Sequence, residues 1–212
     1  MKKILAIGAH QDDIEIGCAG TLMKFIEKGD LVSFIVFTDG GNWSGKDREV
    51  RLREQKLSCE KLGVNKLYHL DQKDGYLESN PEMIDVLREI ISKESPDFIF
   101  THHYNDSHQD HRTVFRITNS SCRECNNILM YQSITSSNFS PTVFCDISEN
   151  FDGKIDVLNC FSSQVEKYKL RDEDLIEKVK IFADINGSMI HKSKAEGFVP
   201  IKLSLDEEAN CQ

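Results

Sequence analysis

The chain opens with the stretch Lys3-Ile-Leu-Ala-Ile-Gly-Ala-His-Gln-Asp-Asp-Ile-Glu15, in which an apolar run ends in one histidine and three acids. The run over residues 3–9 is short and continuous, as expected of a strand buried on both faces of a sheet. Charged groups directly after such a strand are costly to bury, so we expect them to serve chemistry rather than packing. The turn over residues 9–15 therefore marks a candidate site.

A second cluster of the same kind lies much further along the chain. Ser107-His-Gln-Asp-His111 follows the apolar run Phe98-Ile-Phe100. Both clusters have the order His, Gln, Asp, and both stand where an expected strand ends. The shared order predicts one metal site that is assembled from two strand ends.

Strands and amphipathic helices alternate through the first part of the chain. Strands are expected over residues 3–9, 31–38, 66–70 and 97–101, and helices over 21–28, 48–62 and 81–94. This alternation predicts an α/β fold with three layers, in which helices cover both faces of a mostly parallel sheet. Ligands bind at the carboxyl ends of the strands in such sheets, and both clusters fall there.

The pattern is less regular beyond residue 125. Strands are expected over 127–132 and 142–147, and helices around 165–170 and over 173–190. The sequence contains no internal repeat and no linker rich in Pro or Ser. A single domain over residues 1–212 is therefore expected, with residues 126–212 as the part that shapes the substrate site.

The composition excludes several classes of protein. The 212 residues carry a net charge of −9, which argues against nucleic acid as a partner. No apolar run approaches the ~18–20 residues of a membrane span, and the N-terminal run is too short for a signal peptide. Seven cysteines at scattered spacings, with a lone CxxC at Cys122 and Cys125, indicate reduced thiols and a cytoplasmic protein.

The first cluster contains the main parts of a hydrolytic metal site. His10 and Asp13 stand three residues apart in one turn, and His111 would complete a His₂Asp set of the kind that holds a catalytic zinc. Asp12 is adjacent to Asp13 but directed elsewhere. This position suits Asp12 to take the proton from a metal-activated water.

The second cluster supplies groups that could assist the reaction. His108, one helical turn before His111, is a candidate to stabilise an oxyanion or to protonate a leaving group, and Asp110 is a candidate to orient it. For His102 and His103, packing or substrate contact is favoured over a ligand role. The assembled set predicts metal-assisted hydrolysis of a carbonyl or phosphoryl bond. Zn²⁺ suits the ligands best, and Fe²⁺, Co²⁺ or Mn²⁺ would also fit.

The two clusters also match a pair of motifs from known proteins. Ala9-His-Gln-Asp-Asp13 is similar to the AHPDD motif, and His108-Gln-Asp-His111 to the HPDH motif, of the PIG-L/LmbE-type zinc deacetylases. Other segments that match in order and spacing are Gly17-Cys-Ala-Gly-Thr21, Thr38-Asp-Gly40, Arg51-x-x-Glu54 and Ala195-Glu-Gly-Phe198. The resemblance covers nearly the whole chain and implies a Rossmann-like fold.

The resemblance implies metal-dependent removal of the N-acetyl group from an N-acetylglucosamine-type sugar or sugar conjugate. Carried over residue by residue, the resemblance makes His10, Asp13 and His111 the metal ligands and Asp12 the general base. It makes His108 the partner of the oxyanion or the leaving group, and Asp110 the residue that supports His108. Arg51 falls where the family places a substrate-contacting arginine, with Arg48 as the alternative. Asp39, at the matched strand end, is a further substrate-binding candidate. Relatives of this type often form homo-oligomers, so a homo-oligomer is expected.

Three positions depart from the family pattern. Gln11 and Gln109 replace the usual prolines, which loosens the turns but removes no ligand. Ile14 stands where the family usually has Glu. This replacement calls into question a contact that the Glu would make behind the metal ligands or to the substrate. The role expected of Glu15 is to be solvated or to make a contact behind the metal ligands.

Two other functions remain open. The same metal chemistry could act on a different bond, an amide or ester of a non-sugar or thiol-sugar conjugate. The chain could also be a metal-binding or sugar-binding relative without turnover. Asp12 argues against the latter, because a binding site does not need a second carboxylate beside Asp13. The expected partner is a small acetylated amino sugar, with no nucleic acid and no membrane.

Overall fold

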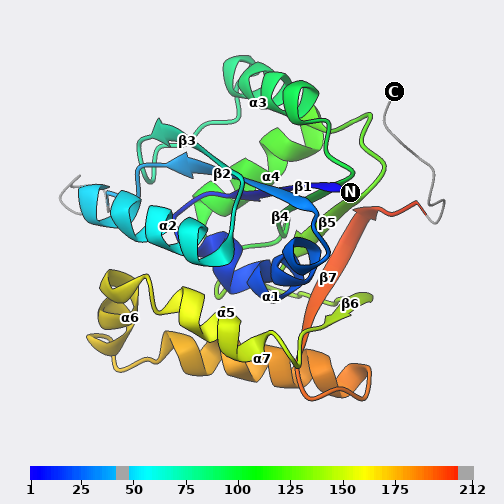
Figure 1. The fold of residues 1–212 in the computed structure, drawn as a ribbon. Coiled ribbons are helices and arrows are strands. Elements are labelled where there is room, and N and C mark those ends of the chain that lie inside the picture. Colours follow the sequence, from blue (N-terminus) through cyan, green and yellow to red (C-terminus); the bar gives the residue numbers. More distant parts are fainter. Residues whose placement is uncertain (42–47, 205–212) are drawn as a thin grey trace.

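A single sheet forms the middle layer of the protein (Figure 1), in a computed structural model that describes residues 1–41 and 48–204. Within these residues the sheet has seven strands in the order β3-β2-β1-β4-β5-β7-β6. The strands are β1 Lys3–Gly8, β2 Leu31–Thr38, β3 Lys66–Gln72, β4 Phe98–His102, β5 Ile128–Tyr131, β6 Val143–Asp146 and β7 Ala195–Lys202.

The sheet is mostly parallel. Strands β1 to β5 run in one direction, and β7 pairs antiparallel with both β5 and β6. The chain builds outward from β1 through β2 to β3 and then crosses to β4 on the other side of β1. Such a reversal leaves a crevice at the carboxyl ends of the two strands beside it, where ligands bind. The α/β fold predicted from the sequence is confirmed.

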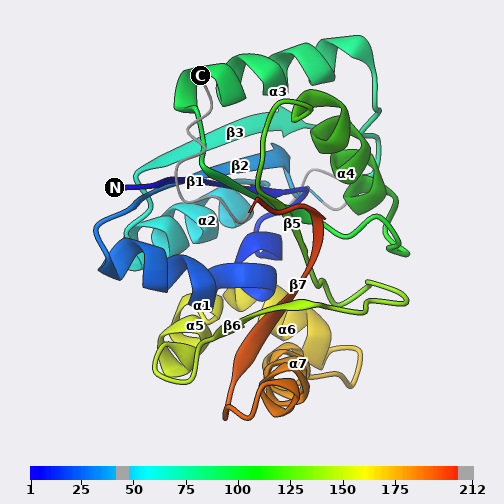
Figure 2. The ribbon, with the colours of Figure 1, turned by 90° about the vertical axis from the view of Figure 1, so that its right-hand side faces the viewer.

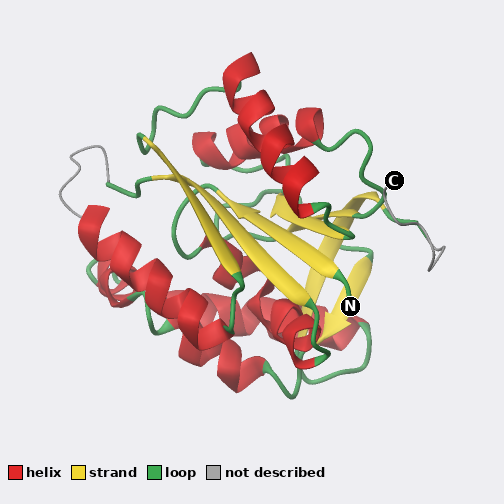
Figure 3. Cartoon of the chain, turned by 45° about the horizontal axis from the view of Figure 1, so that its top comes forward, coloured by secondary structure: helices red, strands yellow, loops and turns green. Residues whose placement is uncertain are grey.

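Helices cover both faces of the sheet (Figure 3). They are α1 Asp13–Glu27, α2 Arg48–Leu62, α3 Pro81–Glu94, α4 Gln109–Ser121, α5 Phe151–Leu158, α6 Ser162–Lys169 and α7 Leu175–Met189. Ile4 and Ala6 of β1 belong to the core beneath α1 and α2, whereas Leu5 and Ile7 belong to the core beneath α3 and α4. Because strand side chains alternate between faces, β1 is buried on both sides, as predicted. Among the described residues, none of the helices has both the length and the apolar character needed to cross a membrane.

Helix α1 begins earlier than the helix predicted over residues 21–28. It starts at Asp13, directly after the turn, because Asp12 adopts a left-handed backbone conformation with φ 103° that redirects the chain. The first two-thirds of the helix is buried, so it lacks the polar face that reveals a helix in a sequence. Gly17 in this part packs against the ring of Tyr131, which a methyl group would overlap.

The last third of the chain adds a layer of helices on the side of α1 and α2 that faces away from the sheet (Figure 1). Figures 1 and 2 show α5, α6 and α7 in this layer, with β6 and β7 beside it. Ile16 of α1 packs against Leu158, Leu175 and Val179 of the layer. The helices predicted around 165–170 and over 173–190 correspond to α6 and α7, whereas α5 and β7 were not predicted.

A buried ion pair fastens this layer to α1. Lys154 of α5 and Glu196 of β7 lie 2.6 Å apart, and both are at most 4% exposed. Glu196 also accepts hydrogen bonds from the backbone N–H groups of Gly20 and Thr21, and Lys154 donates to the carbonyl of Ile16. The charges are thus satisfied by one another and by the backbone of α1, as buried charges must be.

The described cysteines are free thiols, as predicted. Cys122 and Cys125 are buried at the end of α4, in the core beneath α3 and α4. They belong to none of the potential metal-binding groups found among the described residues. Cys211 lies outside the described residues.

Candidate metal and active site

An open pocket of about 610 Å³ lies where residues after β1, β3 and β4 meet α6. Its lining residues are His10, Asp12, Asp13, Ile16, Gly40, Arg51, Asp74, His108, His111, Ser133, Ile134, Thr135, Gln164, Lys167, Tyr168 and Arg171. Both predicted clusters therefore reach the same pocket, and the last third of the chain contributes the remaining side.

The three predicted metal ligands converge in this pocket. Asp13 Oδ2 lies 3.3 Å from His10 Nδ1, and Asp13 Oδ1 lies 3.3 Å from His111 Nε2. All three side chains are largely buried. The backbone N–H of His10 donates to Asp13 Oδ2 at 2.7 Å, which holds the turn that brings His10 and Asp13 together. The tertiary structure thus joins residues from two distant segments as the two clusters predicted.

Further side chains that could bind a metal surround these three residues. The groups whose donor atoms lie within 4.8 Å of one another are His10 with His108 and His111, Asp13 with His102 and His111, and His10 with Asp74 and Asp110. Imidazole nitrogens and carboxylate oxygens are the ligands that zinc and similar divalent ions prefer. The donor chemistry of the pocket therefore fits a divalent metal.

The charge around His10 supports the same conclusion. Burial by itself lowers the pKa of His10, but the neighbouring carboxylates of Asp110, Asp13 and Asp74 raise it well above its usual value. Within the part of the chain that the structure describes, Asp110 Oδ1 is buried without a hydrogen-bond partner. Buried negative charge of this kind is stabilised by a cation.

His102 packs behind the set rather than lining the pocket. Its Nε2 accepts a hydrogen bond from the backbone N–H of Ala9 at 3.0 Å, and its ring stacks on His111 with 4.0 Å between centroids. Burial lowers the pKa of His102 to about 4, so the ring is neutral. The packing or substrate-contact role favoured for this residue stays a prediction, because its Nε2 also lies 3.2 Å from Asp13 Oδ2 and His102 belongs to one of the donor groups.

Asp106 orients His111 and was missed by the sequence analysis. Its Oδ2 lies 3.2 Å from His111 Nδ1, the ring nitrogen that faces away from Asp13. Asp106 also accepts hydrogen bonds from Ser133 and Thr135. Although burial opposes ionisation, the contact with His111 lowers the pKa of Asp106. Its place two residues before His108, just ahead of the second cluster, was the only available sequence signal.

Asp12 lines the pocket beside Arg51. Asp12 Oδ1 lies 3.4 Å from Arg51 Nη2, which also donates to the carbonyl of Gln11. Burial raises the pKa of Asp12; Arg51 opposes the shift, and the charge of Asp13 adds to it. The left-handed backbone of Asp12 is an uncommon conformation for a residue other than glycine. Asp12 thus lies in the same pocket as the candidate metal ligands, but it belongs to none of the three donor groups named above.

His108 and Asp110 are arranged differently from the predicted pair. The backbone N–H of Asp110 donates to His108 Nδ1 at 3.3 Å, while the Asp110 carboxylate turns to His10 Nε2 and to the N–H of Gly75. Burial and the positive charges at His10 and His111 lower the pKa of His108. Because Nδ1 accepts a hydrogen bond, the proton of the neutral ring is assigned to Nε2.

Comparison with known proteins identifies the family of this chain. Residues 5–122, which hold both His-Asp clusters, match the PIG-L family, described as GlcNAc-PI de-N-acetylase. The chain belongs to the PIG-L family. YaiS of Escherichia coli (strain K12), an uncharacterized deacetylase, is 36% identical over 159 residues, which cover 71% of this chain and 84% of YaiS. The resemblance inferred from the two motifs is confirmed, and the chain is a member of a deacetylase family.

Solved structures share the fold of this PIG-L protein. The conserved protein TT1542 from Thermus thermophilus superposes with a TM-score of 0.86 at 23% identity, covering 97% of each chain. The N,N'-diacetylchitobiose deacetylase from Pyrococcus horikoshii, in complex with its inhibitor MPG, has a TM-score of 0.80 at 26% identity. That match covers 94% of this chain and 84% of the Pyrococcus chain.

Two of the departures from the PIG-L motif, Gln11 and Ile14, lie behind the pocket, whereas Gln109 is exposed and donates to the carbonyl of Gly75. Gln11 is fully buried, and its Nε2 donates to the carbonyl of Thr38. Ile14 is a core residue. Glu15 is fully buried and accepts hydrogen bonds from Gln55 and Ser58 of α2, so it is not solvated. Burial raises the pKa of Glu15 to about 7.

The three predicted substrate-binding residues are placed differently. Arg51 lines the pocket, but Arg48 and Asp39 are not among the described lining residues. Arg48 is about half exposed and pairs with Asp71. Asp39 Oδ1 accepts from the backbone N–H groups of Gly41 and Asp74, and so holds the loop that carries Asp74.

Asp74 is a second functional candidate that the sequence analysis missed. Its Oδ1 lies 3.1 Å from His10 Nε2, and it lines the pocket from the loop after β3. No histidine cluster surrounds it in the sequence. Its only signal was its place near the end of a predicted parallel strand.

Proposed function

We propose that this PIG-L protein is a divalent-metal-dependent hydrolase, with Zn²⁺ as the favoured ion, that removes the acetyl group from an N-acetylglucosamine-type sugar or sugar conjugate. The observation that carries the proposal is the meeting of His10, Asp13 and His111 in one pocket, with the carboxylate of Asp12 beside them. The name of the structurally similar diacetylchitobiose deacetylase supports an acetylated amino sugar as the substrate.

His10, Asp13 and His111 are the residues that would hold the ion. A zinc ion bound by two neutral imidazoles and one carboxylate lowers the pKa of a water molecule to about 7 and polarises a carbonyl oxygen. Asp106 fixes the ring of His111 from behind through its 3.2 Å contact with Nδ1. Partners of this kind set the tautomer and direction of a ligating histidine.

Asp12 is the proposed general base. Its carboxylate lies in the pocket, outside the proposed ligand set, and takes the proton of the attacking water. Burial raises the pKa of Asp12, which brings its basicity closer to that needed near neutral pH. Arg51, 3.4 Å away, keeps the carboxylate ionised and directed in the resting protein.

His108 is the proposed partner of the acyl oxygen or the leaving amine. With its Nδ1 turned to the backbone N–H of Asp110, its Nε2 proton is free to be donated. Its ring centroid lies 4.7 Å from that of His10, so the donor stands close to the proposed metal. A preorganised donor at this position stabilises negative charge that develops on the acyl oxygen.

Acetate release tests the proposal. The protein is incubated with a panel of N-acetylated amino sugars, with and without a chelator, and acetate is measured. We expect release that the chelator abolishes. No release from any sugar by the metal-loaded protein would contradict the proposal.

Two variants test the division of roles. We expect Asp13→Ala to lose both metal and activity, whereas Asp12→Ala keeps metal and loses about 10²–10⁴-fold in rate, the usual contribution of a general base. Metal content is measured by mass spectrometry of the purified variants. Equal loss of metal in the two variants would reverse the assignment of base and ligand.

A further inference from the structure

The turn that follows α4 brings two cysteines together. Cys122 ends α4, where its backbone N–H donates to the carbonyl of Thr118. The backbone N–H of Cys125 donates to the carbonyl of Cys122 at 3.1 Å, which closes a β-turn over residues 122–125. The Cα atoms at the two ends of a β-turn lie less than about 7 Å apart, close to the ~4.4–6.8 Å that a disulfide spans. The backbone therefore holds the two cysteines within reach of one another.

The two side chains are also in contact, because a hydrogen bond joins the thiol of Cys122 to the sulfur of Cys125. The other described thiols bond instead to a backbone carbonyl or a side-chain amide, namely Cys18 to Ile14, Cys59 to Gln55, Cys145 to Asp146 and Cys160 to Asp156. The turn after α4 thus differs from the surroundings of these cysteines in that it pairs thiol with thiol.

The charges at this turn favour a thiolate at Cys125. The hydrogen bond from Cys122 lowers the pKa of the Cys125 thiol; burial opposes this shift, the ammonium group of Lys202 adds to it, and Glu124 opposes it. The same hydrogen bond raises the pKa of Cys122, as does burial. Lys202, at the end of β7, is held beside the turn by its hydrogen bond to the carbonyl of Arg123. Because the thiolate is the nucleophile, Cys125 is the sulfur that attacks.

Cys125 is also the more accessible of the two thiols. The two middle residues of the turn, Arg123 and Glu124, are exposed, and Cys125 is 6% exposed against 1% for Cys122. Both cysteines belong to the apolar core beneath α3 and α4, which suits a neutral disulfide. An attacking thiol with a lowered pKa and a second thiol beside it is the arrangement found at sites of reversible thiol oxidation.

We propose that Cys122 and Cys125 form a site of reversible oxidation, at which a small disulfide such as oxidised glutathione converts the two thiols to an intramolecular disulfide. The Cys125 sulfur attacks one sulfur of the small disulfide, whose S–S bond breaks, and the released thiolate takes up the proton that Cys125 lost. The Cys122 sulfur then gives up its proton and attacks Sγ of Cys125 in the mixed disulfide, and the second small thiolate leaves with that proton. Two protein thiols are oxidised, and one small disulfide is reduced to two thiols.

The site is separate from the proposed active site. His111 lies in the first turn of α4 and Cys122 at its end, about 16 Å further along the helix. The inference therefore does not depend on the deacetylase function, and its tests measure thiol chemistry rather than activity.

Peptide mapping of the native protein tests the inference. The protein is equilibrated with mixtures of reduced and oxidised glutathione, its remaining thiols are blocked with N-ethylmaleimide, and it is digested with trypsin and chymotrypsin. Cleavage after Arg123 and Tyr131 separates Cys122, Cys125 and Cys145. We expect a disulfide between the peptides that carry Cys122 and Cys125, and its release by dithiothreitol. Absence of this link under oxidising mixtures, or a link of either cysteine to another one, would overturn the inference.

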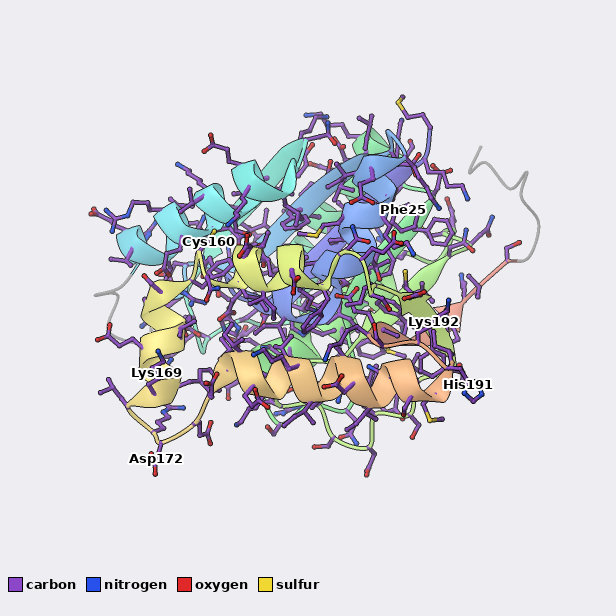
Figure 4. The ribbon with its side chains drawn as sticks, turned by 60° about the horizontal axis from the view of Figure 1, so that its bottom comes forward. Phe25, Cys160, Lys169, Asp172, His191 and Lys192 are labelled. Atoms are coloured by element: carbon purple, nitrogen blue, oxygen red, sulfur yellow. The ribbon has the colours of Figure 1, made fainter. Side chains whose placement is uncertain are left out.

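Cys160 is the matched control within the same sample. Figure 4 shows it after the end of α5, and it is partly exposed, with the carbonyl of Asp156 as its partner. We expect Cys160 to form at most a mixed disulfide with glutathione. Disulfides from Cys160 to other cysteines in a yield equal to the Cys122–Cys125 link would show unselective oxidation and would count against the proposed site.

Single substitutions test which sulfur attacks. In Cys122→Ser, Cys125 should still form the mixed disulfide but cannot resolve it, so glutathione should stay attached. In Cys125→Ser, Cys122 should be largely unreactive. Mass spectrometry of the intact variants measures the attached glutathione over time. Faster addition to the Cys125→Ser variant than to the Cys122→Ser variant would reverse the order of attack.

Lys202→Gln tests the activation of Cys125. Loss of the ammonium group raises the pKa of Cys125, so the rate of oxidation near neutral pH should fall about threefold or more, since the smaller thiolate fraction outweighs the higher nucleophilicity. Lys169→Gln is the matched control, because Lys169 is an exposed lysine on α6 (Figure 4); it should keep the native rate. Equal rates in the two variants would overturn the role given to Lys202.

Discussion

The two sides of the pocket differ in how the fold positions them. On one side, His10 lies in the turn after β1 and His111 lies in the first turn of α4, and buried contacts to Asp13 and Asp106 hold their rings. On the other, residues of α6 reach the pocket from a short helix with one buried residue, Gln164. The comparison suggests that chemistry lies on the rigid strand ends, while the helix side binds and selects the substrate.

His108→Ala tests the strand-end side with the largest expected effect. If the ring donates to the developing oxyanion, kcat falls about 10²–10³-fold, the usual cost of losing such a donor. Metal content should stay unchanged, because His108 is not in the proposed ligand set. Steady-state kinetics and metal analysis measure the two outcomes. Loss of metal from this variant would instead favour the donor group of His10, His108 and His111.

Asp106→Asn weakens the support of His111 without removing a ligand. We expect the affinity for Zn²⁺ to fall about 10–100-fold, as for other residues that orient a ligating histidine. Competition with a chromophoric chelator measures the affinity. Ser133→Ala is the matched control, since it removes a hydrogen bond to Asp106 but keeps the contact with His111. An unchanged affinity in the Asp106 variant would show that the strand-end side does not depend on this contact.

Gly17→Ala disturbs the packing that holds the strand-end side in place. A methyl group at this position meets the ring of Tyr131, and overpacking of this kind costs about 1–3 kcal/mol of unfolding free energy. Gly153→Ala in α5 is the control, because its nearest neighbour is the flexible end of Met23 at 3.2 Å. Urea unfolding followed by circular dichroism compares the two variants. Equal midpoints would mean that α1 adjusts more easily than the buried contact suggests.

Gln164→Ala probes the helix side with the smallest expected effect. Gln164 is 8% exposed and lines the pocket; its Nε2 donates to Ser163 Oγ at 3.3 Å, and the amide carries a second N–H for a sugar hydroxyl. Loss of one such hydrogen bond, about 0.5–1.5 kcal/mol, should raise KM about two- to thirteenfold. We expect kcat to stay within about twofold, because the strand-end groups are unchanged. A fall in kcat of the size expected for His108→Ala would remove the division between the two sides.

Local patterns predicted much of the fold. The helices expected over residues 48–62 and 81–94 coincide with α2 and α3, and the strand expected over 31–38 with β2. The helix α3 shows its period because one face is buried and the other is not, whereas β2 is a continuous apolar run that is buried along nearly its whole length. The start of α1 and the whole of α5 and β7 were not predicted. Burial hides the polar face of α1, and the other two lack a clear alternation.

The sequence by itself determined the family motifs, the parallel α/β order and the expectation that His10, Asp13 and His111 would meet, because strand ends of a parallel sheet lie along one edge. Only the tertiary structure decided which neighbours support them. It turned the carboxylate of Asp110 to His10 and brought Asp74 from another loop. It also set the α6 side of the pocket against the first turn. Such contacts depend on how whole layers pack, and no local spacing encodes them.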